Sequence, residues 1–364
     1  MKGLFTICTL IVFAAACAMC ISFSQKATGP TPVAFNAPKG WPAPVYDFTK
    51  NPLTKEGIAL GRKLFYDGRL SKDGNFACAA CHQQFAAFAT YDHNVSHGFN
   101  NSFTRRNAPG LFNLAWQKEF MWDGGINHLD LQPLAPITDS VEMGESIDSV
   151  LNKLRADTAY QRMFKAAFSD DKITTKYLTR ALSQFLLTMV SANSKYDRVM
   201  RGEDSFNLPQ RLGYEIFQKK CISCHVPPLF TDLSYRSTGL PLDPYLKDFG
   251  RMKITRKPED SLKFKVPSLR NALVTFPYGH DGRFYSLMDV LEHYRSHVVN
   301  APSTDSIVRN KIPLSNFEIG QLKAFIYALT DSVLLKDPQF WPPGYENRVP
   351  TAPTEHVHIY KYQN

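Results

Sequence analysis

Two copies of the pentapeptide Cys-x-x-Cys-His constrain this chain more than any other feature. They occupy residues 78–82 and residues 221–225. In such a motif the two thiols can form thioethers to the vinyl groups of a haem, and the histidine that follows is placed to bind the iron. The sequence therefore predicts two covalently bound c-type haems. Their attachment residues are Cys78, Cys81 and His82 for the first haem, and Cys221, Cys224 and His225 for the second.

A lone Cys-x-x-Cys is more typical of a zinc site or a redox pair. A zinc site needs four convergent ligands, and a redox pair does not require a following histidine. Both copies carry that histidine, which favours haem over either alternative. The other cysteines, Cys8, Cys17 and Cys20, lie near the N-terminus, so the rest of the chain has no disulfide framework.

The N-terminus has the pattern of an export signal. Lys2 is the only early charge, and an apolar run extends from about Leu4 to Phe23, which predicts a signal peptide over residues 1–20 and a periplasmic location. Cys17 follows three alanines, so cleavage before a lipid-modified cysteine, with attachment to a membrane, is one alternative. Another is that the run remains as a membrane anchor, because its length approaches the roughly 20 residues that span a bilayer.

The remaining chain is long enough for two domains. Residues 21–45 are rich in Pro, Gly and Ala and predict a flexible tether. We expect an N-terminal haem domain over residues 46–203, a C-terminal haem domain over 204–336 and a tail over 337–364. The net charge is +9 with dispersed Lys and Arg, which indicates solubility and an acidic partner, with no nucleic-acid binding.

The strongest periodic segments are helical. Apolar residues at helical spacing predict helices over residues 53–65, 147–168, 177–190, 208–220 and 315–329. No comparable run of alternating strands is present, and long Pro/Gly/Asn-rich loops cover residues 92–113 and 227–267. A helix leads into each haem motif, so the halves resemble repeats of one module. The expected fold is all-α, with two cytochrome c-like domains, each built around one covalent haem, and long irregular loops.

The sixth iron ligands must come from outside the two motifs. Two strong ligands suit an iron for electron transfer, whereas an open or displaceable position lets it bind peroxide. For the first haem the local candidates are His93 and His97, although a loop histidine is more often a surface residue. For the second haem, a helix expected from residue 286 carries the candidates Met288, His293, Tyr294 and His297. Periodicity does not choose among them.

An ordered series of short motifs follows the first haem motif and continues past the second. The series comprises residues 106–109 (RNAP), 122–124 (WDG), Gln132, 141–144 (VEMG), 264–271 (FKVPSLRN) and 280–282 (HDG). Across residues 52–335 the chain resembles bacterial di-haem cytochrome c peroxidases. The resemblance implies an oxidoreductase that reduces hydrogen peroxide to water, with electrons from a small cytochrome c or cupredoxin. It also implies a homodimer.

The resemblance assigns a different task to each haem. It implies that the haem of His82 is peroxidatic, with His97 as a displaceable distal ligand, and that the haem of His225 receives electrons. Glu142 matches the general acid/base of the peroxide side, and Gln132 its hydrogen-bonding partner. A carboxylate in a low-dielectric haem pocket has its pKa raised toward this task.

Two further sites follow from the same resemblance. Trp122 matches a tryptophan that lies between the haems and relays electrons. Asn107, with the backbone carbonyls of Thr275 and Pro277, matches a calcium site at the junction of the two domains. Oxygen donors from both halves would let a hard cation couple them.

One position departs from typical peroxidases. Tyr294 stands where their electron-transfer haem takes a methionine, and a similar tyrosine ligand occurs in the relative that matures the tryptophan tryptophylquinone of methylamine dehydrogenase. A phenolate in place of a thioether stabilises ferric iron and lowers the potential; Met288 is the alternative ligand. Two other functions therefore stay open: a di-haem oxidase that acts on a protein or organic substrate through a high-valent state, and a di-haem electron carrier without catalysis.

Overall fold

The structure, a computed structural model, describes residues 29–91 and 93–345. Helices carry the fold, as expected, and a two-stranded antiparallel sheet of β1 (Tyr235–Arg236) and β2 (Phe264–Lys265) adds to them. The all-α prediction is therefore right for the helices and omits this small sheet. None of the helices within the described ranges is long and apolar enough to span a membrane. The predicted signal peptide, lipid site and anchor fall on residues outside those ranges.

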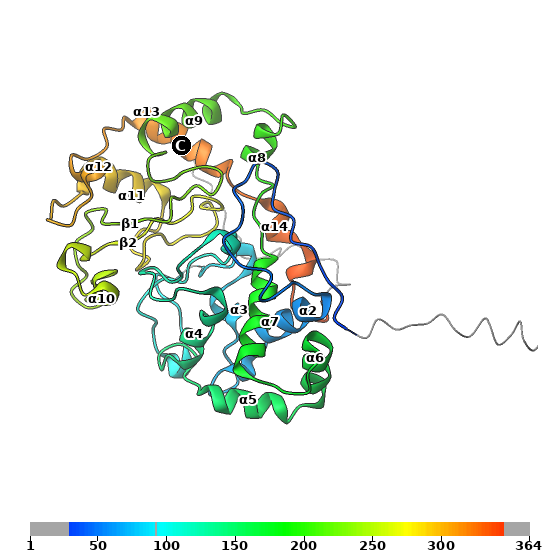
Figure 1. The fold of residues 1–364 in the computed structure, drawn as a ribbon. Coiled ribbons are helices and arrows are strands. Elements are labelled where there is room, and N and C mark those ends of the chain that lie inside the picture. The colour runs from blue at the N-terminus through cyan, green and yellow to red at the C-terminus, as the bar shows by residue number, and fades with distance from the viewer. Residues whose placement is uncertain (1–28, 92, 346–364) are drawn as a thin grey trace, which may run out of the picture.

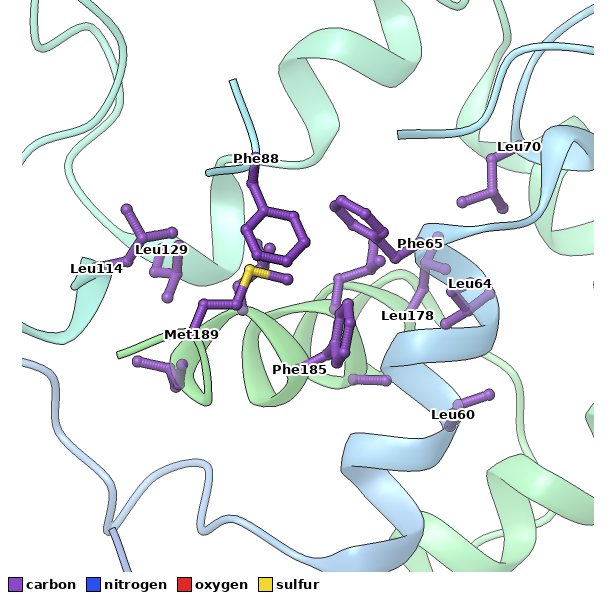
Figure 2. Close-up of a cluster of buried hydrophobic side chains, with 14 of the residues drawn as sticks. Leu60, Leu64, Phe65, Leu70, Phe88, Leu114, Leu129, Leu178, Phe185 and Met189 are labelled. Atoms are coloured by element: carbon purple, nitrogen blue, oxygen red, sulfur yellow. The ribbon is translucent and has the colours of Figure 1, made fainter. Parts of the chain in front are cut away.

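The N-terminal half is built on the pair α2 (Lys55–Phe65) and α7 (Thr175–Leu187). Thr54 begins α2, because its side chain accepts a hydrogen bond from the backbone N–H of Gly57. Apolar side chains of both helices form a common core, shown in Figure 2 with Leu60, Phe65 and Phe185 among its members. The shorter helices of this half are α3 (Cys78–Cys81) and α4 (Leu134–Thr138), whereas α8 (Lys195–Met200) contributes Tyr196 to the core of the other half.

The single helix expected over residues 147–168 is two helices, α5 (Ile147–Arg155) and α6 (Thr158–Phe168). Asp157 causes the break. Its backbone is extended, and its side chain accepts a hydrogen bond from the N–H of Ala159 as the N-cap of α6. The apolar periodicity continues through this interruption, which is why the sequence alone did not reveal it.

The C-terminal half is built on the pair α9 (Leu208–Lys220) and α13 (Asn316–Tyr327). Phe217 and Phe325 from these helices pack with Phe230 in a second core. Figure 1 shows the helices of the two halves in two groups. The remaining helices are α10 (Met252–Thr255), α11 (Leu287–Glu292) and α12 (Ser306–Arg309), followed after α13 by α14 (Ser332–Lys336).

Residues 29–45, expected to form a flexible tether, are packed against both halves. The ring of Trp41 lies 4.9 Å from that of Trp116, whose indole N–H donates to the carbonyl oxygen of Pro42 at 2.8 Å. The ring of Trp41 also lies 4.8 Å from the guanidinium of Arg270. The expectation failed because composition does not show that the segment's aromatic residues have partners far along the chain.

The chain returns to the N-terminal half after α13. Figure 1 shows α14 beside the N-terminal helices, and the amide of Gln84 donates to the carbonyl oxygens of Leu334 and Asp337 at 3.1 and 2.9 Å. Phe340 is buried against Phe88 in the first core. The described start of the predicted tail is thus part of that core. The division into domains at residues 46–203 and 204–336 stays a prediction.

Candidate functional site

The first haem motif presents His82 with one ring nitrogen already bonded. Cys78 and Cys81 lie on α3, and the Nδ1 of His82 lies 2.7 Å from the carbonyl oxygen of Phe88. Because a carbonyl can only accept, Nδ1 carries the proton and Nε2 keeps its lone pair. Burial lowers the pKa of His82, which keeps the ring neutral. This is the state in which Nε2 can bind iron.

The second motif repeats this arrangement. The Nδ1 of His225 lies 3.2 Å from the carbonyl oxygen of Phe230 and 3.1 Å from that of Pro267. Phe88 and Phe230 both have left-handed backbones, with φ of 59° and 55°, and are fully buried. In each half, therefore, a buried aromatic residue turns its carbonyl back onto the histidine of the motif.

Both histidines line one cavity of about 650 Å³. Its lining includes Cys81, Cys221 and Cys224, while Cys78 packs against the first core. None of these four thiols forms a disulfide. The histidines and cysteines that line this cavity are the residues that would hold the predicted pair of haems. When bound, these haems would supply the redox chemistry.

Glu142 and Gln132 line the same cavity as His82. Burial raises the pKa of Glu142 to about 7, and the negative charge of Asp139 adds to the effect. The Glu142 backbone is fixed, because its carbonyl accepts the N–H of Phe99 at 2.6 Å. Gln132 follows the short turn Leu129–Leu131. The cavity therefore holds a carboxylic acid that can gain and lose a proton near neutral pH.

Trp122 lines the cavity and is bonded to both halves of the chain. Its indole N–H donates to the carbonyl oxygen of Asn107 at 2.8 Å. Its own carbonyl accepts the N–H of Lys265, on β2, at 2.8 Å. These two bonds fix the backbone and the ring of Trp122 in the wall of a cavity that contains both haem-binding histidines.

The three residues of the predicted calcium site also line the cavity. Asn107 is buried, donates its side-chain N–H to the carbonyl oxygen of Asn94 at 3.2 Å, and donates its backbone N–H to the carbonyl oxygen of His280 at 2.8 Å. The side-chain oxygen of Asn107 and the carbonyls of Thr275 and Pro277 are of the donor type that calcium prefers. Within residues 29–91 and 93–345, no group of three or more His, Cys, Asp or Glu side chains could hold a metal ion. Calcium stays a prediction.

His97 lies apart from these groups. Its side chain is exposed and does not line the cavity. The ring contacts those of His93, at 5.1 Å, and Phe103, at 4.6 Å. Only the backbone approaches the haem motif, where the carbonyl oxygen of His97 lies 3.8 Å from the sulfur of Cys81. The structure thus does not bring the predicted distal ligand to Glu142 and Gln132.

Among the four candidate ligands of the second haem, Tyr294 has the most suitable position. It lines the cavity and belongs to a wide π-type turn, His293–His297, that follows α11. Burial raises the pKa of Tyr294. Met288 and His297 are exposed and lie outside the lining, and the Nε2 of His293 is engaged at 2.9 Å by the carbonyl of Thr238.

Comparisons with known proteins identify the family of the chain. A family model described as di-haem cytochrome c peroxidase matches residues 55–205. The methylamine utilization protein MauG of Methylophilus methylotrophus is 35% identical over 310 residues, which cover 82% of this chain and 89% of that protein. This chain belongs to the di-haem cytochrome c peroxidase family. Membership implies two c-type haems, which the paired motifs and the cavity accommodate.

Relatives within the di-haem peroxidase family carry different names. The cytochrome-c peroxidase IdrP1 of Pseudomonas sp. (strain SCT) is 31% identical, with 81% of this chain and 86% of that protein covered. A solved MauG-like protein associated with microbial copper homeostasis is 31% identical, with a TM-score of 0.78 over 85% of this chain and 99% of that one. Family membership therefore does not choose between a peroxidase and a MauG-like activity.

Sequence reasoning missed the ion pairs that join the halves of this family member. Arg106 bonds Asp248 through two nitrogens, at 2.5 and 2.9 Å, and Asp123 at 2.7 Å. All three residues line the cavity. Arg106 and Asp123 stand in motifs of the family series, but Asp248 lies in the long loop 227–267, where no local pattern identifies a partner.

Proposed function

We propose that this chain reduces hydrogen peroxide to water at the haem held by His82, with electrons from a small periplasmic cytochrome c or cupredoxin. The observation that carries the proposal is Glu142, a carboxyl group with a pKa near 7 in the cavity that His82 lines. Breaking the O–O bond of peroxide needs a group that takes a proton from one oxygen and returns it to the other. A pKa near the working pH suits both steps.

Each residue then has a defined task. Glu142 accepts the proton of the bound peroxide and delivers it to the departing oxygen, which leaves as water. The amide of Gln132 orients the peroxide by hydrogen bonding. Trp122 conducts electrons from the half of the chain that holds His225, and Asn107, Thr275 and Pro277 hold calcium where the halves meet. His225 and Tyr294 would bind the second iron.

A second candidate is oxidation of a protein or organic substrate by the same haem pair. Two observations favour it. Tyr294 lines the cavity whereas Met288 does not, and His97 does not face the peroxide side. An enzyme with this arrangement would react with peroxide without prior reduction. The similarity to proteins named MauG agrees with this candidate.

Stopped-flow mixing with hydrogen peroxide tests these functions on the di-haem protein. If the fully oxidised form reacts with peroxide, and a reduced cytochrome c or cupredoxin returns it to its starting state over many turnovers, the chain is a peroxidase that needs no reductive activation. Reaction only after half-reduction indicates a peroxidase gated by His97. If the oxidised form reacts but oxidises only an organic or protein substrate, the second candidate holds. Absence of any reaction would leave an electron carrier and refute both candidates.

A further inference from the structure

Tyr235 and Trp122 lie on either side of β2, at the junction of the two halves. It stands on β1 directly opposite Lys265 of β2, and the N–H of Lys265 bonds the carbonyl of Trp122 at 2.8 Å. The hydroxyl of Tyr235 reaches the backbone of Gly124, where an added Cβ would collide with it. An oxidisable phenol thus lies beside the segment that carries the proposed electron relay.

The phenol has a proton acceptor in place. The hydroxyl of Tyr235 donates to the Oε2 of Glu119 at 2.8 Å. Arg251 holds the other oxygen of Glu119 at 3.1 Å and lies over the face of the Tyr235 ring, 4.0 Å from its centroid. Burial and the bond to Glu119 raise the pKa of Tyr235, so the phenol is protonated at neutral pH.

This arrangement determines how Tyr235 could lose an electron. The guanidinium over the ring opposes a positive charge on the ring, because like charges at this distance repel. The electron can therefore leave readily only if the proton leaves with it. A carboxylate at hydrogen-bond distance is placed to accept that proton.

We propose that Tyr235 is a redox-active tyrosine that reduces oxidised Trp122. One electron passes from Tyr235 to Trp122, the O–H bond of Tyr235 breaks, and the proton moves to the Glu119 carboxylate, which leaves a neutral tyrosyl radical. The inference rests on the proposed function for its oxidant, because hydrogen peroxide acting through the haem pair must first oxidise Trp122. The small cytochrome c or cupredoxin of the proposed function later returns one electron to the radical, and Glu119 returns the proton, which restores the phenol.

The chain offers a matched control. Tyr160 on α6 also donates to a carboxylate, the Oδ2 of Asp67 at 2.6 Å. Its ring lies in the first core, away from the strand that contacts Trp122. Loss of the Tyr160 hydroxyl should therefore disturb a similar hydrogen bond without affecting the route from Trp122.

Freeze-quench EPR spectroscopy of the di-haem protein, labelled with ring-deuterated tyrosine, tests the proposal. After hydrogen peroxide is added, we expect a tyrosyl radical signal that narrows with the label. The signal should be lost in Tyr235→Phe and retained in Tyr160→Phe. In Glu119→Gln the radical should form about 10²–10⁴ times more slowly, because the amide cannot act as the base. A signal that persists in Tyr235→Phe overturns the proposal.

A second oxidant separates this proposal from the proposed function. Hexachloroiridate(IV) removes single electrons without peroxide chemistry. If it yields the Tyr235 radical in a protein that does not consume peroxide, the redox role stands and the peroxidase function fails. If peroxide is consumed but neither oxidant gives a tyrosyl signal that depends on Tyr235, the function stands and the redox role is refuted.

Discussion

Gly61 and Gly213 occupy the same place in the two halves of the molecule. Gly61 on α2 meets the carbonyl oxygen of Ala181 on α7, and Gly213 on α9 meets that of Gln321 on α13. A Cβ at either glycine would overlap that backbone oxygen. Each contact joins the helix that precedes a haem motif to the later helix that supports it. The two haem sites therefore depend on the same close contact between two helices, repeated once in each half.

Gly61→Ala and Gly213→Ala should each destabilise the protein by about 1–3 kcal/mol, because backbone on both sides prevents the added methyl group from being accommodated. Gly320→Ala is the control. Gly320 lies on the exposed side of α13 with open space around it, and alanine there should stabilise by roughly 0.5–1 kcal/mol. Urea denaturation of the three variants measures the differences. Equal effects at all three positions would contradict the packing argument.

Arg270 is fully buried and forms two bonds to Asp197, at 2.8 and 2.7 Å. Burial alone would raise the pKa of Asp197, but the bonds from Arg270 hold it below its ordinary value. Asp197→Asn leaves a buried guanidinium without its counter-ion, so we expect a loss of about 3–5 kcal/mol. The ion pair stabilises the wild type above a pH of about 4. This stabilisation is lost as the pH falls further, because protonation removes the charge of the Asp197 carboxylate. The variant should therefore lose less stability than the wild type on acidification, as measured by denaturation at pH 7 and pH 3.

Local patterns in the sequence predicted the parts of the molecule that depend on neighbouring residues. The helix 208–220 has the expected bounds, and a capping box of Asn207 and Gln210 explains where it begins. The packing of Trp41 on Arg270 was not predictable, because no local periodicity couples residues so distant in the chain. The same holds for Arg106 and Asp248.

Only part of the candidate site, too, could be predicted from local patterns in the sequence. The histidines of the two haem motifs were identified from spacing alone, whereas Glu142 and Trp122 required the resemblance to a family. The resemblance placed His97 at the first haem, whereas in the structure its ring contacts those of His93 and Phe103 and does not line the cavity. The sequence also could not show that the turn after α11 widens at Tyr294, which brings its ring into the cavity.

Tyr294→Met should raise the reduction potential of the second haem. A phenolate stabilises ferric iron and a thioether stabilises ferrous iron, so we expect a rise on the order of tenths of a volt, within the roughly 0.8 V that axial ligands span. Met288→Leu serves as the control, because Met288 is exposed and outside the cavity. Spectroelectrochemical titration gives both potentials. A large shift in Met288→Leu, with none in Tyr294→Met, would make Met288 the ligand.

The rate of reaction with peroxide should rise with pH, with a midpoint near 7. Burial and Asp139 raise the pKa of Glu142 to about 7, and only the deprotonated carboxylate, which predominates above that pH, can accept the proton of peroxide. Glu142→Gln should lower the rate by about 10²–10⁴ and abolish this pH dependence. Asp139→Asn removes the neighbouring charge, so it should keep the rate at high pH and move the midpoint to lower pH. Stopped-flow rates between pH 5 and pH 9 decide the matter: a midpoint that Asp139→Asn does not move, or that survives in Glu142→Gln, would show that another group titrates.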